Sequence, residues 1–356
     1  MNDLPQTSPL TLGLFEKRIE GDDGLLELAR LRFQQAGLGA ELHAGTPEQL
    51  DWLMRFQPSP QSPVVIHLPR DFNLAEENSR RRMVELAAHG AGRVHGFVLH
   101  DHRDLVVRAE EYLRAAAELN ARLQSIEGCP MVFVEYAVGL EPEVFAKFFD
   151  SIRALDRISA CIDVSHVGIR SAQRAYAQTH PGEDVCALKS QPAQLPRVMA
   201  DVETAVNSAL PTVLHLIETL GALGKPVHFH LHDGHPLSTF SPFGVSDHLS
   251  FMATIPLGFK WRGQRTVSSM FGPAGLAQII LQALKNIGGE RTSFTLEIHP
   301  AAGQLPLGDA SALFGHWRDK TNAEKMNHWL AVLAENHRLL REAIAAVRVG
   351  AHAASR

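Results

Sequence analysis

The chain has 356 residues, of which 45% are hydrophobic, and its formal net charge is −5 at pH 7. These values allow a large hydrophobic core, and the acidic balance argues against a protein whose main task is to grip the phosphate backbone of nucleic acids. The densest basic run, Arg80-Arg81-Arg82, lies in a helical pattern and is interpreted as a solvated helix face.

The first residues, the apolar stretches and the cysteines of the chain indicate its cellular location. The first residues, MNDLPQTSPL, lack the basic start and apolar run of a signal peptide. No apolar stretch in the sequence approaches the roughly 20 residues that cross a bilayer. Cys129, Cys161 and Cys186 are scattered and form no CxxC, which argues against a disulfide framework or a zinc knuckle. We therefore expect a soluble, cytoplasmic protein.

Short apolar runs alternate with longer amphipathic segments along most of the chain. Helical spacing is evident at residues 24–37, 105–123 and 141–155, and Gly or Pro residues mark the joins. The apolar runs predict strands at residues 10–15, 38–42, 63–68, 95–100, 131–136, 159–164, 226–231 and 293–298.

Strand–helix units repeated in this way predict a parallel sheet with helices outside it, and at about eight units such a sheet closes into a (β/α)8 TIM barrel. A doubly wound open sheet is the alternative, but no Gly-rich dinucleotide fingerprint follows the first strand. We expect a single domain over residues 1–356, with its barrel core at about 10–300 and a helical extension at about 309–346. Residues 167–225 and 233–269, on either side of the seventh strand, are predicted insertions.

The seventh predicted strand, within the segment PVHFHLHDGH, carries histidines at alternate positions. Successive side chains of a strand point to opposite faces, and Val227, Phe229 and Leu231 suit the helix-covered face. His228, His230 and His232 therefore point into the barrel. The same alternation predicts that further polar side chains of other strands point into the barrel: His67, His100, Glu135, Asp163, Glu297 and His299.

These residues stand at the ends of their strands, and the carboxyl ends of barrel strands form the active-site mouth. Imidazoles and carboxylates that converge there need a partner to offset their desolvation, and a divalent cation supplies one. Mixed His, Asp and Glu ligands suit Mn, Zn, Co or Fe. A single histidine on a strand is more often a hydrogen-bonded core residue, and His228, the deepest of its group, is interpreted in that way. Asp233 is predicted to cap a loop or orient a ligand, and Asp101 and His102 are predicted to be turn residues.

The chain resembles the xylose isomerase-like barrel superfamily, which includes sugar phosphate isomerases and epimerases and the endonuclease IV group. The resemblance follows the strand order and rests on short phrases: IHLP at the third strand, VLH at the fourth, VEY at the fifth, IDVSH at the sixth, HLHD at the seventh and LEIHP at the eighth. Asp163 and His166, in a D-x-x-H phrase, are its most specific pair.

Likeness to the epimerases implies one metal ion held by Glu135, Asp163, His230 and Glu297, with His166 contacting the substrate. Glu135 and Glu297 would then exchange the proton next to a carbonyl carbon, one as base and the other as acid. This interpretation predicts an isomerase or epimerase of a sugar, a sugar acid or a related polyol.

Likeness to the endonuclease IV group implies one to three ions. His67 and His100 would hold a further ion, with Glu135 as the bridging ligand. A third ion would use His166 with an Asp-x-His pair, but this chain has Asp247 and His248 adjacent, so these two and His232 are candidates for either metal or substrate. A multinuclear site predicts a phosphoester hydrolase or, with iron, an oxidase; a barrel that binds metal without catalysis is the third alternative.

We favour the isomerase by a small margin, on the carboxylates, on the acidic charge and, as the resemblance implies, on the frequency of this chemistry in the superfamily. The expected partner is a small-molecule substrate, with neither nucleic acid nor membrane favoured. The last predicted helix, with Met326, Trp329, Leu330, Leu333 and Leu340 on its apolar side, could pack on its own barrel or on that of a second copy, so a homo-oligomer stays open.

Overall fold

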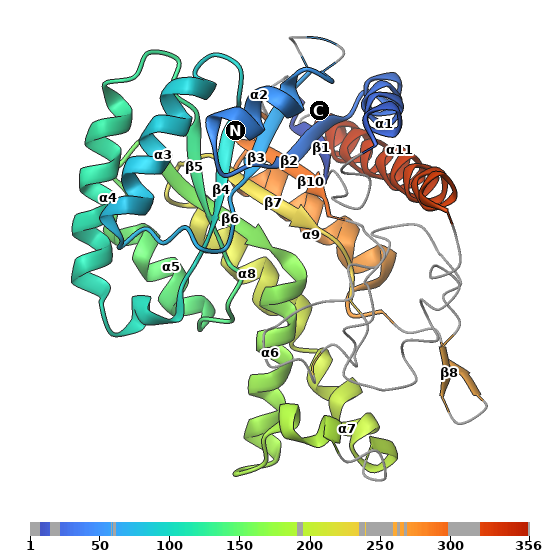
Figure 1. Cartoon of the computed structure of the whole chain (residues 1–356). Helices are drawn as coiled ribbons and strands as arrows, with labels where there is room; N and C mark the ends of the chain where they lie inside the picture. The colour runs from blue at the N-terminus through green and yellow to red at the C-terminus, as the bar shows by residue number, and fades with distance from the viewer. Residues whose placement is uncertain are drawn as a thin grey trace. The chain divides into compact units, whose positions relative to one another are not determined.

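Eight parallel strands close into a barrel in the computed structural model, in the order β1-β10-β7-β6-β5-β4-β3-β2 (Figure 1). The predicted (β/α)8 TIM barrel is confirmed. Each strand lies within about two residues of its predicted position: β1 (Leu10–Leu14), β2 (Gly39–His43), β3 (Val64–His67), β4 (Gly96–His100), β5 (Met131–Glu135), β6 (Ile158–Asp163), β7 (Val227–Leu231) and β10 (Thr292–Leu296).

The structure describes residues 8–14, 22–57, 59, 62–190, 195–234, 239, 259–261, 264–266, 269–297 and 321–354. The remaining elements within these ranges are α1 (Asp23–Ala36), α2 (Pro47–Met54), α3 (Glu77–Gly90), η2 (Arg103–Val106), α4 (Ala109–Gln124), α5 (Pro142–Ser151), α6 (Val164–Thr179), η3 (Val185–Ser190), α7 (Leu195–Val206), α8 (Ala209–Gly221), β8 (Phe259–Trp261), β9 (Gln264–Thr266), α9 (Gly272–Asn286), η5 (Gly289–Arg291) and α11 (Asn322–Ala354).

The chain divides into two compact units. The first comprises Met1–Asp163, Leu216–His230 and Ala283–Leu296, and so contains nearly all of the barrel strands. The second comprises Val164–His215, Leu231–Gln282 and Glu297–Arg356. The prediction of a single domain stays a prediction.

Local sequence signals account for the boundaries of several elements. Asp22 begins α1 by accepting the N–H of Leu25 at 3.1 Å, and Gly37 ends it with a φ of 72°, a conformation that favours glycine. At the start of α2, the Thr46 hydroxyl accepts the N–H of Gln49 at 3.3 Å. The sixth strand ends at Asp163 rather than at residue 164, because α6 begins at once with Val164.

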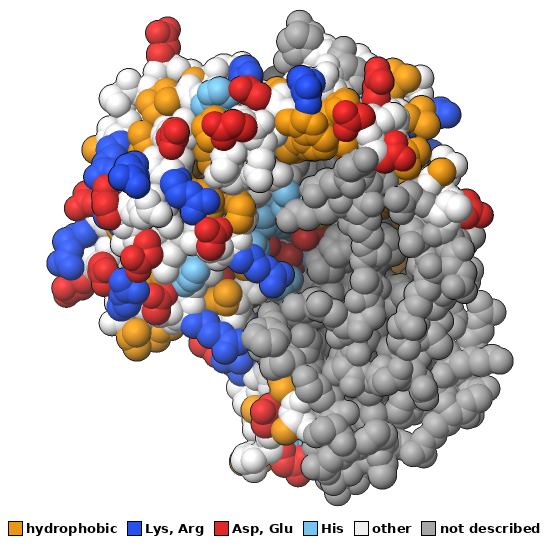
Figure 2. All heavy atoms as spheres, in the orientation of Figure 1, with side chains coloured by type: hydrophobic (Ala, Val, Ile, Leu, Met, Phe, Trp, Pro, Cys, Tyr) orange, Lys and Arg blue, Asp and Glu red, His pale blue; other side chains and the backbone are white. Residues whose placement is uncertain are grey.

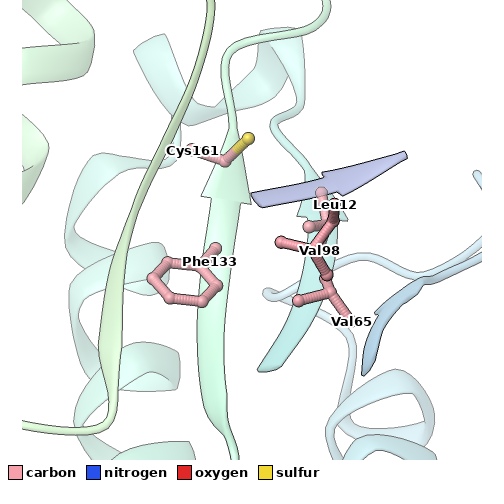
Figure 3. Close-up of a cluster of buried hydrophobic side chains, with 5 residues drawn as sticks. All are labelled: Leu12, Val65, Val98, Phe133 and Cys161. Atoms are coloured by element: carbon pink, nitrogen blue, oxygen red, sulfur yellow. The ribbon is translucent and has the colours of Figure 1, made fainter. Parts of the chain in front are cut away.

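A cluster of apolar side chains lies inside the barrel, one step along the strands before the candidate site residues. Leu12, Val65, Val98, Phe133 and Cys161, from five different strands, form one buried cluster (Figure 3). Four of these side chains lie two residues before a candidate site residue on the same strand: Val65 before His67, Val98 before His100, Phe133 before Glu135 and Cys161 before Asp163. Because a strand repeats its facing every two residues, the cluster is a floor directly beneath the candidate site residues.

Acidic and basic side chains are mixed over the face of the first unit in Figure 2. Arg80 on α3 pairs with Glu77 at 2.7 Å and with Glu118 of α4 at 3.2 Å, and Arg122 pairs with Glu77 at 2.8 Å. Arg80 is buried, so the interpretation of the Arg80–Arg82 run as a solvated face was wrong for its first residue. Its guanidinium also donates to two backbone carbonyls, which explains why burial is tolerated.

The predicted insertion before the seventh strand contains most of α6 and all of η3, α7 and α8, and the hairpin β8–β9 lies within the insertion after it. The expected C-terminal helix is α11; of its predicted apolar residues, Met326, Trp329, Leu333 and Leu340 are buried, whereas Leu330 is half-buried. Within the described ranges, no helix combines the length and apolar character needed to span a membrane.

Candidate metal centre

Neighbouring strands place the predicted ligands beside one another. His100 of β4 is the register partner of Glu135 of β5, and Asp163 of β6 is the partner of His230 of β7. Glu135, Asp163 and His230 offer ligand atoms that all lie within 4.8 Å of one another, and all three side chains are buried. The side chains that the parity argument turned inward therefore lie together, and their role as metal ligands stays a prediction.

Glu135 connects these residues to the histidines of β3 and β4. Its Oε2 lies 3.4 Å from His67 Nε2 and 3.5 Å from His100 Nε2, while its Oε1 lies 3.4 Å from His230 Nδ1. The Glu135 side chain is buried, and among the described residues its Oε2 accepts no hydrogen bond. Oε2 of Glu135 thus faces the imidazoles of His67 and His100, and Oε1 faces the imidazole of His230.

His67 and His100 approach each other closely. Their Nε2 atoms are 3.2 Å apart and their ring centroids 4.9 Å apart. Together with Glu135, they offer ligand atoms that all lie within 4.8 Å of one another. Nitrogen and carboxylate lone pairs that converge in a buried volume are stabilised when a proton or a metal cation lies among them.

Glu41 on β2 was missed by the sequence reasoning, although its carboxylate is fully buried at the centre of this group. Its Oε1 lies 2.9 Å from His67 Nδ1 and 2.9 Å from His230 Nε2. A signal existed: in the predicted strand at 38–42, apolar Ala40 and Leu42 flank Glu41, which gives it inward parity.

The other oxygen of Glu41 reaches deeper into the barrel. Oε2 accepts a hydrogen bond from Thr295 Oγ1 at 2.6 Å and lies 3.1 Å from His228 Nε2. His228 Nδ1 lies 2.6 Å from Ser293 Oγ, and its ring stacks on Phe133 with centroids 5.3 Å apart. His228 is therefore a hydrogen-bonded core residue, as predicted.

The charges of this group shift one another's pKa values. Burial alone would raise the pKa of Glu41, but the charge of His230 and the hydrogen bonds from His228, His230 and His67 hold it well below its usual range. Burial would likewise raise the pKa of Glu135. The charges of His100, His230 and His67 outweigh the effect of burial, so the pKa of Glu135 is lowered. Both carboxylates are therefore ionised at neutral pH and offer negative charge to a cation.

The pKa values of His67 and His228 shift in opposite directions. Burial acts to lower the pKa of His67, but the hydrogen bond to Glu41 and the charge of Glu135 outweigh it, so the pKa is raised. For His228, burial prevails over Glu41 and lowers the pKa. His228 is accordingly held neutral in the core.

In the second unit, the predicted residues Glu297, His232 and His166 lie near one another. Glu297, the first residue after β10, donates its N–H to the carbonyl of Leu231 at 3.1 Å, and its Oε2 lies 3.6 Å from His232 Nε2. The rings of His232 and His166 have centroids 6.3 Å apart. His166 lies in the first turn of α6, where Ser165 donates to the carbonyl of His232 at 2.7 Å.

Asp233 is a capping residue, as expected. Its carboxylate accepts the N–H of Gly234 at 2.8 Å and the N–H groups of Met270, Phe271 and Gly272 at 3.0–3.1 Å, at the start of α9. These bonds fasten the segment after β7 to the α9 N-terminus. Asp233 does not need a metal to satisfy its charge.

Asp101 fixes the segment that follows Glu135. Its Oδ1 accepts the N–H of Ala137 at 2.9 Å and that of Val138 at 2.8 Å. Burial raises the pKa of Asp101 to about 7. The adjacent His102 contacts the Phe72 carbonyl through Nε2 at 3.0 Å. Both are structural residues of a turn, as predicted.

Three predicted residues, Asp247, His248 and His299, lie outside the described residues. Their proposed roles as metal ligands, substrate contacts or inward-facing side chains therefore stay predictions. The described part of the chain nonetheless offers a donor set of buried imidazoles and carboxylates around Glu135 that could hold metal ions.

No protein-family model matches the chain, and no curated protein sequence matches it. Among solved structures, the crystal structure of AsfvAP:AG covers 87% of this chain and 98% of its own, at 15% identity and a TM-score of 0.45. The carboxyl transferase domain of Rhizobium etli pyruvate carboxylase, with pyruvate and biocytin, covers 96% of this chain and 49% of its own, at 11% identity and a TM-score of 0.39. These likenesses concern the fold alone.

Proposed function

We propose that the chain is a metal-dependent enzyme with two divalent ions bridged by Glu135, and that it hydrolyses a phosphoester of a small molecule. The observation that carries the proposal is the Glu135 carboxylate, buried with one oxygen facing His67 and His100 and the other facing His230. Each of two ions bridged by a carboxylate needs further ligands, and imidazoles on both sides of Glu135 would supply them. The phrases shared with the xylose isomerase-like superfamily agree with such a site.

The residues fit divalent metal ions by type and by burial. His67, His100 and one oxygen of Glu135 would hold one ion, and the other oxygen of Glu135 with Asp163 and His230 would hold the second. Imidazole with carboxylate suits Zn, Mn, Fe or Co more than Mg or Ca, which prefer oxygen ligands alone. We propose Glu297, at the end of β10, as a further ligand of the second ion.

The chain's own residues would hold and screen the reacting groups. The ionised Glu135 carboxylate supplies negative charge that retains cations, Asp163 offers a second carboxylate as a ligand, and the apolar floor of Val65, Val98 and Phe133 seals the centre from below. We propose His166 and His232 as substrate contacts. When bound, the ions would lower the pKa of water and polarise a phosphoryl oxygen.

The position of Glu135 weakens its alternative role as a catalytic base. Three imidazole nitrogens lie within 3.5 Å of its two oxygens, and its pKa is lowered by them. A general base works best with a pKa near the operating pH. A carboxylate held ionised in this way is better suited to binding cations than to exchanging a proton.

The isomerase or epimerase of a sugar, sugar acid or polyol is kept as the second candidate. Glu135, Asp163 and His230 form a cation site that does not need His67 or His100. This single-ion arrangement favours proton transfer between Glu135 and Glu297. A binuclear iron oxidase would use the same ligands as the hydrolase, so the metal's identity separates these two.

The first test is elemental analysis of protein purified without chelators, for the wild type and for His67→Ala, His100→Ala and a control, His89→Ala. His89 is on the surface, where its Nε2 lies 2.9 Å from Asp51, and it is not one of the candidate site residues. We expect about two ions per chain in the wild type and the control, and loss of about one in His67→Ala and His100→Ala. Zinc, manganese or cobalt would favour hydrolysis, and iron would favour oxidation.

The other outcomes are equally informative. One ion per chain that persists in both histidine variants would overturn the two-ion centre and favour the isomerase, to be tested with ketoses and keto-polyols. No metal in the wild type would overturn metal dependence altogether. With two ions present, hydrolysis of small phosphomonoesters and phosphodiesters should disappear in Glu135→Gln but persist in His89→Ala.

A further inference from the structure

The buried carboxylate of Glu41 contacts three histidines, two of which belong to the proposed metal centre. Oε1 lies between His67 Nδ1 and His230 Nε2, at 2.9 Å from each, and Oε2 lies 3.1 Å from His228 Nε2. Glu41 is fully buried, and all four side chains lie in the first unit. No metal ligand role is needed to explain Glu41, because hydrogen bonds account for these distances.

An ionised carboxylate can only accept hydrogen bonds. Each imidazole nitrogen at hydrogen-bond distance from Glu41 must therefore carry the proton: Nδ1 in His67 and Nε2 in His230. In a neutral imidazole, the opposite nitrogen then bears the lone pair. Those opposite nitrogens are His67 Nε2 and His230 Nδ1, and both face Glu135 at 3.4 Å.

The third histidine agrees with this assignment independently. If His228 donates from Nε2 to Glu41, its Nδ1 must accept a hydrogen bond. Ser293 Oγ lies 2.6 Å from that Nδ1 and is able to donate to it. Thr295 Oγ1 donates to the same carboxylate oxygen at 2.6 Å. The whole network is consistent with one protonation pattern.

We propose that Glu41 is a positioning residue that sets the tautomers of His67 and His230, so that the lone pair of each ring points at Glu135. The inference rests on the proposed metal centre, because it assigns the nitrogens that would bind the ions. Metal-bound histidines commonly donate their other N–H to a carboxylate or carbonyl, and loss of such a partner typically lowers metal affinity about 10–100-fold. Here one carboxylate would serve histidines on both sides of the bridge.

The test compares wild type with Glu41→Gln, and with Ser293→Ala as a control that removes a hydrogen bond of His228 only. Glutamine has the same shape but one accepting oxygen, so it cannot accept hydrogen bonds at both ends. Imidazole 15N and 13C chemical shifts of the metal-free protein report each tautomer when they are recorded at a pH above the raised pKa of His67, where the rings are neutral. We expect Nδ1–H for His67 and Nε2–H for His230 in wild type and in Ser293→Ala.

In Glu41→Gln, we expect a change of tautomer, or a mixture, in at least one of the three histidines. Zinc affinity, measured by competition with a chelating dye, should fall about 10–100-fold in Glu41→Gln and change less than about threefold in Ser293→Ala. Wild-type His67 protonated at Nε2, or unchanged zinc affinity in a folded Glu41→Gln, would overturn the inference.

The two proposals fail in different ways. Wild-type protein without metal affinity would overturn the metal centre, yet the tautomers of the metal-free protein would still show whether Glu41 orients the rings. If Glu41→Gln does not fold, the wild-type spectrum alone decides, because the opposite tautomer of His67 or His230 contradicts the role of Glu41.

Discussion

Replacement of Asp101 tests how the segment after Glu135 is held. Its Oδ1 accepts two backbone N–H groups, from Ala137 at 2.9 Å and Val138 at 2.8 Å, while its Oδ2 is buried without a hydrogen-bond partner among the described residues. In Asp101→Ala, both N–H groups lose their acceptor. A buried donor left unpaired costs about 1–3 kcal/mol.

The two donors differ in burial. Ala137 is buried, whereas Val138 is half-buried, so water can replace the lost acceptor at Val138 in part. Removing a buried carboxyl also relieves its desolvation, which offsets some of the loss. We therefore expect Asp101→Ala to lower the free energy of unfolding by about 2–4 kcal/mol, near the low end of the range for two lost acceptors.

Asp101→Asn is the matched control, because its Oδ1 can still accept both N–H groups. We expect it to stay within about 1 kcal/mol of the wild type. The assay is denaturant unfolding of metal-free protein followed by circular dichroism, with zinc affinity measured in parallel. Asp101→Ala should weaken zinc binding as well, since the segment that it frees begins two residues after Glu135. Equal stability of the Ala and Asn variants would refute the reasoning.

Three further predictions follow from other parts of the first unit. A methyl group on Gly96 would lie 2.6 Å from the Phe133 ring, so Gly96→Ala should cost about 1–3 kcal/mol in thermal or denaturant unfolding, and less in a Phe133→Leu background. Burial lowers the pKa of Lys225 from 10.5 to about 8, so the unfolded state binds more protons between these values and wild-type stability should rise with pH there. That rise should be smaller in Lys225→Met, and equal pH profiles in denaturant titrations would contradict it. Removing metal with a chelator should lower the melting temperature of the wild type more than that of Glu135→Gln, because the wild type loses the cation that its buried carboxylate binds.

The alternation of residues along single strands was enough to place much of the candidate site. In the seventh strand, apolar Val227, Phe229 and Leu231 occupy one face, so the intervening histidines had to share the other. The same reasoning identified Glu135 and Asp163, which the structure brings together with His230. It also predicted the barrel, because repeated strand–helix units leave few other ways to cover both faces of a parallel sheet.

Residues far apart in the chain depend on barrel closure, and their pairing was not evident from any one strand. Glu41 lies 187 residues before His228 and 254 before Thr295, yet all three meet inside the barrel. Its inward parity was readable, but its partners were not, because strand register and closure decide which side chains reach the centre.

The order of strands and helices, the inward facing of the histidines and carboxylates, and the residue types suited to a cation could all be predicted from the amino-acid sequence. These follow from local periodicity, which each segment carries on its own. The structure was needed to show that one oxygen of Glu135 faces His67 and His100 while the other faces His230, and that Glu41 contacts two of these rings from the other side. Such contacts depend on the register between strands and on the closure of the barrel, which no single segment specifies.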